Sequence, residues 1–415
     1  MIDKNLFLCD LAVVAIFKDE ARYLKEWLDY HLLAGVEHFY LYNNDSSDDF
    51  RKVLAPYVEE NLVTLIDLPG RVMQLPAFND ALEKFRFECR YLAFIDLDEF
   101  IFPKSNRSVV EVVDEILSHD WKAAGLAINW QFFGSNGNEK ADYSRGVLER
   151  FTRRAPSHFT KDLPDHKGNR SVKSIINPRR ADYLWNPHFA IYFPPFHAVN
   201  ENAVPVEEFL NEPVTADKIV VNHYFTKSVE EYGDKINRGR SDVIAERSWD
   251  IFKAHDFNDE FDDGILKYRA ARAKNFSFES NNHRINRVVN SLAQTLKKNF
   301  SAESLEGDLE TFLTCRAVAE KFQIKIDEQD AEELALFCIY QFFNHPRTLN
   351  RFEFQLCVNA LPKILTRPFP VRKEILQVIV EKTLPFICEQ SKLHFDIKAF
   401  VNYKRLRRLL SLIQI

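Results

Sequence analysis

The sequence predicts an α/β fold, in which a mostly parallel, Rossmann-like sheet is flanked by helices, followed by an α-helical C-terminal region. Short apolar runs alternate with amphipathic stretches through the first hundred residues. Repeated units of this length imply right-handed crossovers between parallel strands. Beyond about residue 275, proline and glycine become rare and amphipathic helical patterns take over. A chain of 415 residues exceeds the usual size of one core, so we expect two domains, 1–274 and 275–415.

The first strand is the continuous apolar run Leu11–Phe17, which is typical of a strand buried on both faces. Apolar side chains then recur at helical spacing from Glu20 to Ala34, and Gly35 suits a left-handed cap. The remaining elements expected in this region are strand His38–Tyr42, a short helix through Leu54, strand Leu62–Asp67, a helix from about Pro76 to Arg90, and strand Tyr91–Ile95.

Acidic residues interrupt the apolar stretch "YLAFIDLDEFIFP" directly after its strand. Ligands of an open parallel sheet bind beyond the carboxyl ends of its strands, so we expect Asp96 and Asp98 at the functional edge. Side chains at i and i+2 of an extended chain point to the same side, so both carboxylates are expected to face one cation. Oxygen ligands of this kind suit Mg²⁺ or Mn²⁺. A solvated acidic turn is the alternative interpretation.

Composition narrows the class of protein. The formal net charge is only -6, so no nucleic-acid partner is expected. The six cysteines sit singly among apolar neighbours, as buried free thiols do, and neither a leader nor a long apolar run is present. These features predict a cytoplasmic protein. The stretch Tyr403–Ile415 combines four basic residues with leucine and isoleucine. It fits peripheral contact with the inner face of a membrane or a terminal helix packed on its neighbours.

Several motifs occur in an order that resembles nucleotide-sugar glycosyltransferases of the GT-A fold: "KDEARYLKEWLDYH", "YNNDSSDD", "FNDAL" and "FIDLDEF". More closely, the chain resembles glycosyltransferase family 92. This resemblance covers roughly residues 10 to 245 and rests on the further motifs "NWQFFGSNG", "VLERFTRR", "KSIINP", "NPHF" and "NHYFTKSVEEYGDKINRGR".

The resemblance implies a site for a UDP-sugar donor and a Mn²⁺ or Mg²⁺ ion. The residues implied in donor binding are Lys18, Asp19, Glu20, Asn44, Asp45, Asn79, Asp96 and Lys227. Metal ligation is implied for Asp96, Asp98 and His223. His223 ends an apolar run, and a neutral imidazole can complete a divalent ion's shell; a satisfied core histidine is the alternative. Asn44 stands where the family usually has an acidic residue, and Asn79 can equally be an exposed helix residue. The further cations Lys235, Arg238 and Arg240 can meet a diphosphate or form a solvated helix face.

Family 92 is regarded as inverting, which implies a general base on the acceptor side. The candidate catalytic residues are His188 and Glu149, and Trp130 is the candidate acceptor-binding platform, with core packing as its alternative. The expected activity is metal-dependent transfer of a sugar, galactose by family precedent, to a hydroxyl of a glycan or glycolipid such as lipopolysaccharide or capsule.

Two other classes of function remain open. A nucleotidyltransferase on a related sheet is expected to carry a glycine-rich phosphate loop near the N-terminus, and "AIFKDEARYLKE" contains no glycine. A binding module that has lost turnover is disfavoured because Asp96, Asp98 and His223 are all present. Product formation separates these alternatives from a transferase.

Overall fold

The computed structural model divides the chain into two units, Phe7–Asn286, and Met1–Leu6 with Arg287–Ile415. Residues 275–286, which we expected in the C-terminal domain, fall in the first unit. The structure describes residues 3–324 except for 165, 194–195, 245, 275, 277–278, 280, 297–310, 312–313 and 316. The helices predicted after residue 324 and the basic stretch Tyr403–Ile415 lie outside the described residues.

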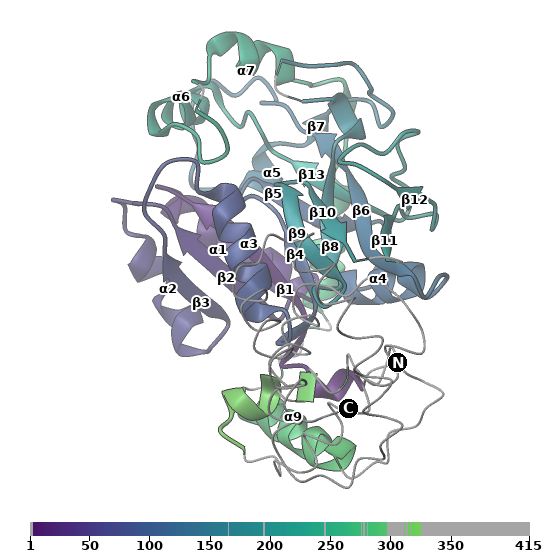
Figure 1. Ribbon diagram of the computed structural model, residues 1–415. Helices are drawn as coiled ribbons and strands as arrows, with labels where there is room; N and C mark the ends of the chain where they lie inside the picture. Colours follow the sequence, from purple (N-terminus) through teal and green to yellow (C-terminus); the bar gives the residue numbers. More distant parts are fainter. Residues whose placement is uncertain are drawn as a thin grey trace, which may run out of the picture. The chain divides into compact units, whose positions relative to one another are not determined.

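The core of the first unit is a ten-stranded sheet (Figure 1). Strand β1 (Cys9–Phe17) pairs in parallel with β2 (His38–Asn43) on one side and with β4 (Cys89–Phe94) on the other, and β2 pairs in parallel with β3 (Val63–Asp67). Nearly every residue of β1 is buried, as expected for a strand covered on both faces. The predicted α/β class with a mostly parallel sheet is confirmed.

Antiparallel strands enter the sheet beyond β4. Strand β8 (Val172–Ile176) lies between β4 and β6 (Ala123–Phe132) and is antiparallel to both. Strand β13 (Ile219–His223) pairs in parallel with β6 and antiparallel with β5 (Glu99–Pro103), the strand that follows the acidic turn. The sheet edge beyond β6 is formed by β11 (His197–Val199) and β12 (Pro205–Val206).

Two hydrophobic clusters cover the two faces of the sheet. Alternate β1 residues, including Val13 and Ala15, pack in one cluster, and Val14 and Ile16 pack in the other, as the two-residue period of a strand requires. The elements on the first face are α1 (Ala21–Leu33), α2 (Phe50–Glu59) and α4 (Val109–Leu117). Those on the second are α3 (Gln74–Phe85) and the hairpin of β9 (Ala181–Asn186) and β10 (Phe189–Tyr192).

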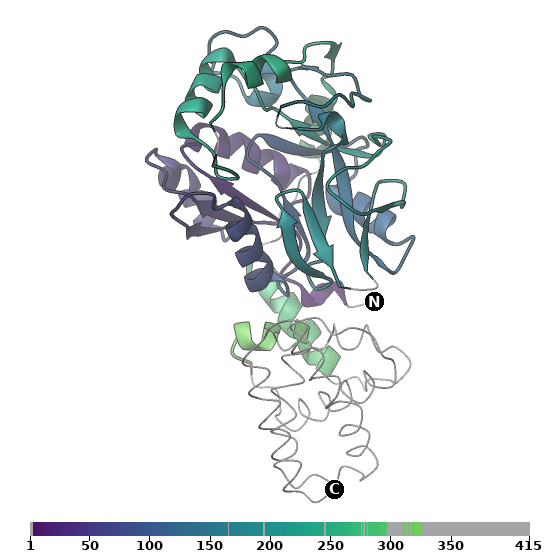
Figure 2. The ribbon, with the colours of Figure 1, turned by 45° about the horizontal axis from the view of Figure 1, so that its top comes forward.

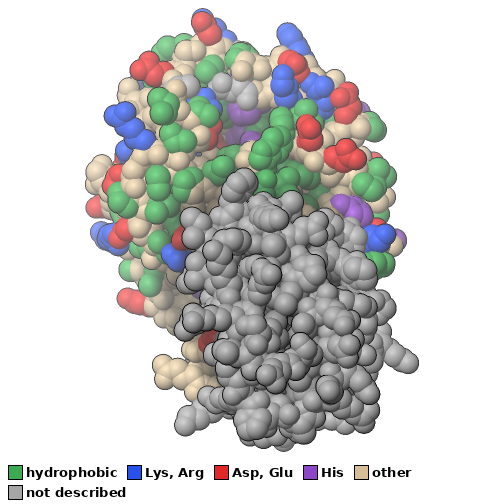
Figure 3. Space-filling view, viewed as in Figure 1, with side chains coloured by type: hydrophobic (Ala, Val, Ile, Leu, Met, Phe, Trp, Pro, Cys, Tyr) green, Lys and Arg blue, Asp and Glu red, His purple; other side chains and the backbone are tan. Residues whose placement is uncertain are grey.

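The remaining described helices lie after β6 in sequence. Figures 1 and 2 show α6 and α7 together beyond one end of the sheet. In the view of Figure 3, hydrophobic side chains gather across the middle of the described face, while both signs of charge are interspersed along its rim. The remaining elements are α5 (Val147–Arg150), β7 (Arg153–Arg154), α6 (Val229–Arg238), α7 (Trp249–His255), β14 (Glu260–Phe261), α8 (Gly264–Ala273), α9 (Asn281–Leu296) and two short 3₁₀ turns, Lys4–Leu6 and Gly168–Arg170.

The predicted boundary between the third helix of this region and the strand that follows it was wrong. The helix expected to reach Arg90 ends at Phe85, and β4 begins at Cys89 rather than at Tyr91. The reason is strand pairing, because Cys9 of β1 lies opposite Cys89. Cys89 and Arg90, which the helical spacing had assigned to the helix, therefore belong to β4. Gly35 has φ +99°, as expected of the helix-ending glycine.

Two further sequence expectations concern the thiols and the membrane. Cys9, Cys89 and Cys315 are buried free thiols, and the other cysteines lie outside the described residues. Among the described helices, none combines the length and the apolar character that crossing a bilayer requires.

Candidate active site

The acidic turn lies at the carboxyl end of β4, where the fold class predicts a ligand site. The chain is not extended there, because it turns at Leu97 and Asp98 before β5 begins. The i, i+2 argument from an extended strand is therefore wrong at this position. Asp96 and Asp98 make different contacts, and each carboxylate has its own ammonium partner.

Two side chains, Lys235 and His223, contact the carboxylate of Asp98. Its Oδ2 accepts a hydrogen bond from Lys235 Nζ at 2.6 Å, and its Oδ1 lies 3.5 Å from His223 Nε2. Burial opposes ionisation of Asp98, but Lys235 and His223 outweigh it and hold the pKa of the carboxyl well below its ordinary value. Burial lowers the pKa of Lys235 to about 8, although Asp98 acts against that shift. The three side chains are all buried.

Asp96 belongs to a second, adjoining network. Its Oδ2 accepts from Lys173 Nζ at 2.8 Å and its Oδ1 from the amide of Gln74 at 2.5 Å. Lys173 also lies 3.5 Å from the Glu99 carboxylate, which is fully buried. Burial raises the pKa of Glu99 well above its ordinary value, with Lys173 opposing that rise. Asp96 is the more accessible of the Asp pair, since its side chain is 31% exposed.

The strand β13 explains why His223 reaches the acidic turn. In the ladder, His223 lies opposite Glu99 of β5 and opposite Phe132 of β6. The last residue of β13 therefore stands beside the first residue after the turn. The sequence predicted that His223 ends a strand, and the structure confirms it.

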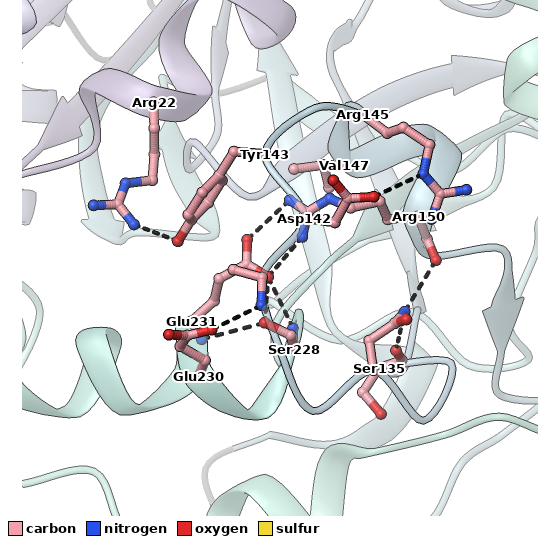
Figure 4. A network of polar contacts seen from close by, with 12 residues as sticks. Arg22, Ser135, Asp142, Tyr143, Arg145, Val147, Arg150, Ser228, Glu230 and Glu231 are labelled. Carbon is pink, nitrogen blue, oxygen red and sulfur yellow. Dashed lines mark hydrogen bonds and ion pairs between the residues drawn. The ribbon is translucent and has the colours of Figure 1, made fainter.

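Helix α6 carries Lys235 and is anchored by a buried ion pair (Figure 4). Ser228 and Glu231 form a capping box at its N-terminus, with the side chain of each bonded to the backbone N–H of the other. The Arg150 guanidinium donates to both Glu231 oxygens, at 2.7 and 2.9 Å, and Tyr23 Oη donates to Oε1 at 3.0 Å. Helices α1, α5 and α6 are thus tied together at one carboxylate.

Two pockets adjoin α6 and share Arg238 as a lining residue. The smaller, of about 340 Å³, is lined by Asp19, Tyr23, Lys227 and Lys235 among others. The larger has a volume of about 630 Å³, within the usual range of small-ligand sites. Polar and cationic residues of the larger pocket include Lys18, Glu20, Asn44, Arg71, Arg240 and Arg247.

The predicted donor residues fall into two groups. Lys18, Glu20 and Asn44 line the larger pocket, and Asp19 and Lys227 line the smaller. Their contacts connect the loops after the first strands. The Asn44 amide donates to the carbonyls of the 68–70 loop, and Asp19 Oδ1 accepts from Ser47. Five of the eight predicted donor residues therefore line the two pockets.

Asp45 and Asn79 do not appear among the residues lining either pocket. Asp45 accepts from the backbone N–H of Gly70 at 3.1 Å. Asn79 bridges α3 to β9, because its amide donates to the Leu184 carbonyl while its oxygen accepts from the Leu184 N–H. The amide of Asn79 is thus engaged in holding the hairpin on the sheet.

Trp130 of β6 lies opposite Val221 of β13 and is only 2% exposed. Its ring centroid lies 4.5 Å from that of His223, 4.9 Å from that of His188 and 5.1 Å from that of His166. The indole Nε1 is buried and has no hydrogen-bond partner among the described residues. Trp130 is therefore packed as a core residue is, and an acceptor-binding role for it stays a prediction.

Among the described residues, the ring of His188 has one defined hydrogen bond, from Nδ1 to the Val172 carbonyl at 3.0 Å. Because a carbonyl only accepts, Nδ1 carries the proton and Nε2 of the neutral ring keeps its lone pair. Burial, together with Lys173, lowers the pKa of His188 to about 3, so the ring is neutral at ordinary pH. Its contact with Trp130 places it in the same side-chain cluster as His223.

Sequence reasoning missed two further histidines of this cluster. His166 Nδ1 and His255 Nε2 are 2.7 Å apart, and His255 Nδ1 bonds to the Ile251 carbonyl at 2.8 Å. His166 also packs against Trp130 and His223. Neither histidine belongs to a motif at recognisable spacing, so only the tertiary fold identifies them.

Glu149, the other candidate base, pairs with Arg269 of α8 at 2.6 Å. Its side chain is 41% exposed, and no contact described for it reaches Asp96, Asp98 or His223. The structure therefore brings His188 into the side-chain cluster around His223 and leaves Glu149 at the surface.

The donor set at the turn fits a divalent ion through Asp98 and His223. Ligands at right angles on bonds of about 2.1 Å have donor atoms about 3 Å apart. The 3.5 Å between Asp98 Oδ1 and His223 Nε2 is close to that separation. Asp96 is turned to Gln74 and Lys173 instead. Among the described residues, no three His, Cys, Asp or Glu side chains converge on one metal position, so such an ion needs ligands from water or substrate.

Known proteins that are similar to this chain include members of the family that the order of its motifs suggested. A glycosyltransferase family 92 protein of Ricinus communis is 24% identical over 237 residues, which are 55% of this chain and 38% of that protein. The chain thus spans well under half the length of that relative. Galactan beta-1,4-galactosyltransferase GALS2 of Arabidopsis thaliana is 29% identical over 100 residues, 22% of this chain and 19% of that protein.

Among solved structures, that of S. aureus TarS 1-349 in complex with UDP aligns with a TM-score of 0.31 and 12% identity, covering 93% of this chain and 92% of that one. The family profile described as Glycosyltransferase family 92 matches residues 12–256, more than half of the chain. It includes the acidic turn, the histidine cluster and α6. The chain belongs to glycosyltransferase family 92.

Proposed function

We propose that this chain is a metal-dependent, inverting glycosyltransferase that moves galactose from a UDP-sugar to a hydroxyl of a surface glycan such as lipopolysaccharide or capsule. The observation that carries the proposal is the grouping of Asp98, His223 and Lys235 beside two pockets that share Arg238. The choice of galactose is supported by the Arabidopsis relative named a galactan galactosyltransferase.

The cationic side chains of the pockets suit a diphosphate. Lys227 and Arg238 line the smaller pocket together with Lys235, and Arg offers a planar fork while Lys offers a point charge. A divalent ion held by Asp98 and His223 would supply Lewis-acid assistance to the leaving diphosphate. The lysines and Arg238 would offset the remaining negative charge on that group.

His188 is the base that the contacts favour. With its Nδ1 proton held by the Val172 carbonyl, Nε2 is free to accept the proton of the acceptor hydroxyl. The acceptor oxygen then forms a bond to the anomeric carbon, the bond from that carbon to the phosphate oxygen breaks, and UDP leaves. Lys173, which together with burial lowers the pKa of His188, also donates a hydrogen bond to Asp96.

We further propose that the acceptor is a glycan or glycolipid. The basic stretch Tyr403–Ile415, which lies outside the described residues, would contact an anionic membrane surface that carries such an acceptor. Binding of the full chain to vesicles with and without anionic lipid, compared with a chain ending before Tyr403, tests this part. Equal binding of both chains would refute the membrane contact.

The test of the enzyme is release of nucleoside diphosphate from a panel of UDP- and GDP-sugars with Mn²⁺ or Mg²⁺. We expect metal-dependent release from UDP-galactose, lost by at least about a hundredfold in Asp98→Asn. The matched control is Asp250→Asn, because the Asp250 side chain is 91% exposed on α7. Release that is indifferent to metal and to Asp98 would overturn the metal site, and release only from another donor would overturn the choice of sugar.

His188→Gln tests the base separately. We expect acceptor-dependent transfer to fall by about 10²–10⁴-fold while UDP affinity is unchanged, because general-base catalysis contributes about that much and His188 lines neither pocket. Loss of UDP affinity in parallel with transfer would indicate a structural role. An unchanged rate would return Glu149 to consideration, and Glu149→Gln is the variant to compare.

A further inference from the structure

Lys235 holds the carboxylate that the proposed metal needs. Its Nζ lies 2.6 Å from Asp98 Oδ2, donates to the Phe225 carbonyl at 2.9 Å, and stands 4.0 Å from the centroid of the Phe225 ring. The side chains of Lys235 and Asp98 are each 8% exposed. The ammonium is therefore a well-anchored cation at the centre of the site rather than a solvated charge of the helix face.

An ammonium at this distance and a divalent ion compete for Asp98. Both would contact the same carboxylate, and their mutual repulsion is weakly screened where the side chains are buried. His223 does not relieve that repulsion, because an imidazole ring supplies no negative charge. A divalent ion on Asp98 Oδ1 would therefore repel the Lys235 ammonium on Oδ2, and this repulsion favours movement of the ammonium away from the carboxylate.

The smaller pocket offers the place to which it can move. Lys235 lines that pocket together with Lys227 and Arg238, so its flexible stem already borders the space where a diphosphate would lie. The helix itself need not shift, because the capping box and the Arg150–Glu231 pair hold the N-terminus of α6. A phosphate oxygen in the pocket would replace the carboxylate as the partner of the ammonium.

We propose that Lys235 is a placeholder cation, which neutralises Asp98 in the substrate-free enzyme and transfers to the donor diphosphate when a divalent ion takes its place. This inference rests on the proposed function. Its thermodynamic consequence is positive coupling between metal and nucleotide: the metal releases Lys235 for the diphosphate, and the diphosphate removes the competitor of the metal. Such coupling is reciprocal, so each ligand tightens binding of the other by the same factor.

The experiment measures Mn²⁺ affinity of the full chain by the electron paramagnetic resonance signal of free Mn²⁺, with and without UDP. In Lys235→Met, which keeps the length of the stem and removes the charge, we expect Mn²⁺ to bind at least about tenfold more tightly than in wild type when UDP is absent. UDP should tighten Mn²⁺ binding in wild type, and that factor should shrink several-fold in the variant.

Two matched variants identify the cause. Lys227→Met removes an ammonium that lies over the Tyr23 ring, at 4.5 Å, and not on Asp98. It should weaken UDP binding without tightening Mn²⁺ binding tenfold. Lys253→Met, at a side chain that is 75% exposed on α7, should leave both affinities unchanged. Tightening of the same size in all three variants would indicate a general charge effect and overturn the inference.

The outcomes separate this inference from the proposed function. If wild type binds Mn²⁺ and UDP but Lys235→Met binds Mn²⁺ no more tightly without UDP, the placeholder role is refuted and the metal site stands. If wild type binds no Mn²⁺ with or without UDP, the metal site fails and the inference fails with it. Lys235→Gln serves as the second variant if the Met variant does not fold, because its amide can still donate to the Phe225 carbonyl.

Discussion

Among the described contacts of α6, the ion pair between Arg150 and Glu231 is the one whose loss should lower the free energy of unfolding most. Replacement Arg150→Met removes two hydrogen bonds, of 2.7 and 2.9 Å, from side chains that are 3% and 1% exposed. Breaking a buried pair from one side costs about 3–5 kcal/mol, because a charge is left without its partner. Tyr23 and Ser228 still donate to Glu231, so we expect the lower end, about 3 kcal/mol.

The assay is unfolding by urea and by heat at pH 7, followed by circular dichroism. A loss of about 3 kcal/mol corresponds to a fall in melting temperature of roughly 6 °C for a unit of this size. The matched control is Lys25→Met, since the pair of Lys25 with Asp29 is exposed and should be worth less than about 0.5 kcal/mol.

The double variant Arg150→Met/Glu231→Gln decides whether the loss comes from the uncompensated charge. Removing both charges should restore much of the stability, so the double variant should lose clearly less than the sum of the two single variants. If the losses add to within about 0.5 kcal/mol, the two side chains do not act as a pair and the reasoning is refuted.

Three further outcomes are expected. Burial opposes ionisation of Glu231, but Arg150 and Ser228 lower its pKa from 4.5 to about 2, so the stability that the pair contributes is present above pH 4.5 and is lost as pH falls toward 2. Arg150→Met should therefore cost more at pH 7 than at pH 3 in urea titrations, and an equal cost would contradict the pKa shift. Tyr23→Phe removes one hydrogen bond to the same carboxylate, at 3.0 Å, and should cost about 1.5–3 kcal/mol in the same titration at pH 7. Gly134→Ala would place a methyl group 2.1 Å from the backbone oxygen of Phe257, so we expect a loss of about 2–3 kcal/mol by thermal unfolding, whereas a loss below 0.5 kcal/mol would show that the loop yields.

Much of the fold follows from local patterns. Apolar runs and helical spacing identified β1 to β4 and the helices between them, because the spacing of apolar residues along a short stretch of sequence distinguishes a strand from a helix. The position of Asp96 and Asp98 at a strand end followed from the same patterns and from the rule for parallel sheets. What failed was the assumption of extended backbone through Leu97, since a turn of this kind depends on where β5 must go next.

The partners of the acidic residues could not be predicted. Asp98 meets Lys235 from α6, and Asp96 meets Lys173 from β8, each across a long separation in sequence. Local pattern assigned Lys235 either to a diphosphate or to a solvated helix face, and only the burial of α6 against the turn excludes the solvated face. The contact between His166 and His255 carries no signal in the sequence for the same reason.

The placement of β13 has a consequence for how the protein is made. The ladder sets Glu99 of β5 opposite His223 of β13, although more than a hundred residues separate them. At translation rates of about 5–20 residues per second, on the order of ten seconds pass between synthesis of the two. During that time β5 and the β6 edge that β13 will occupy lack their partner and present unpaired N–H and C=O groups. The nascent chain should therefore be most prone to aggregation, and most dependent on chaperones, until residue 223 has emerged from the ribosome.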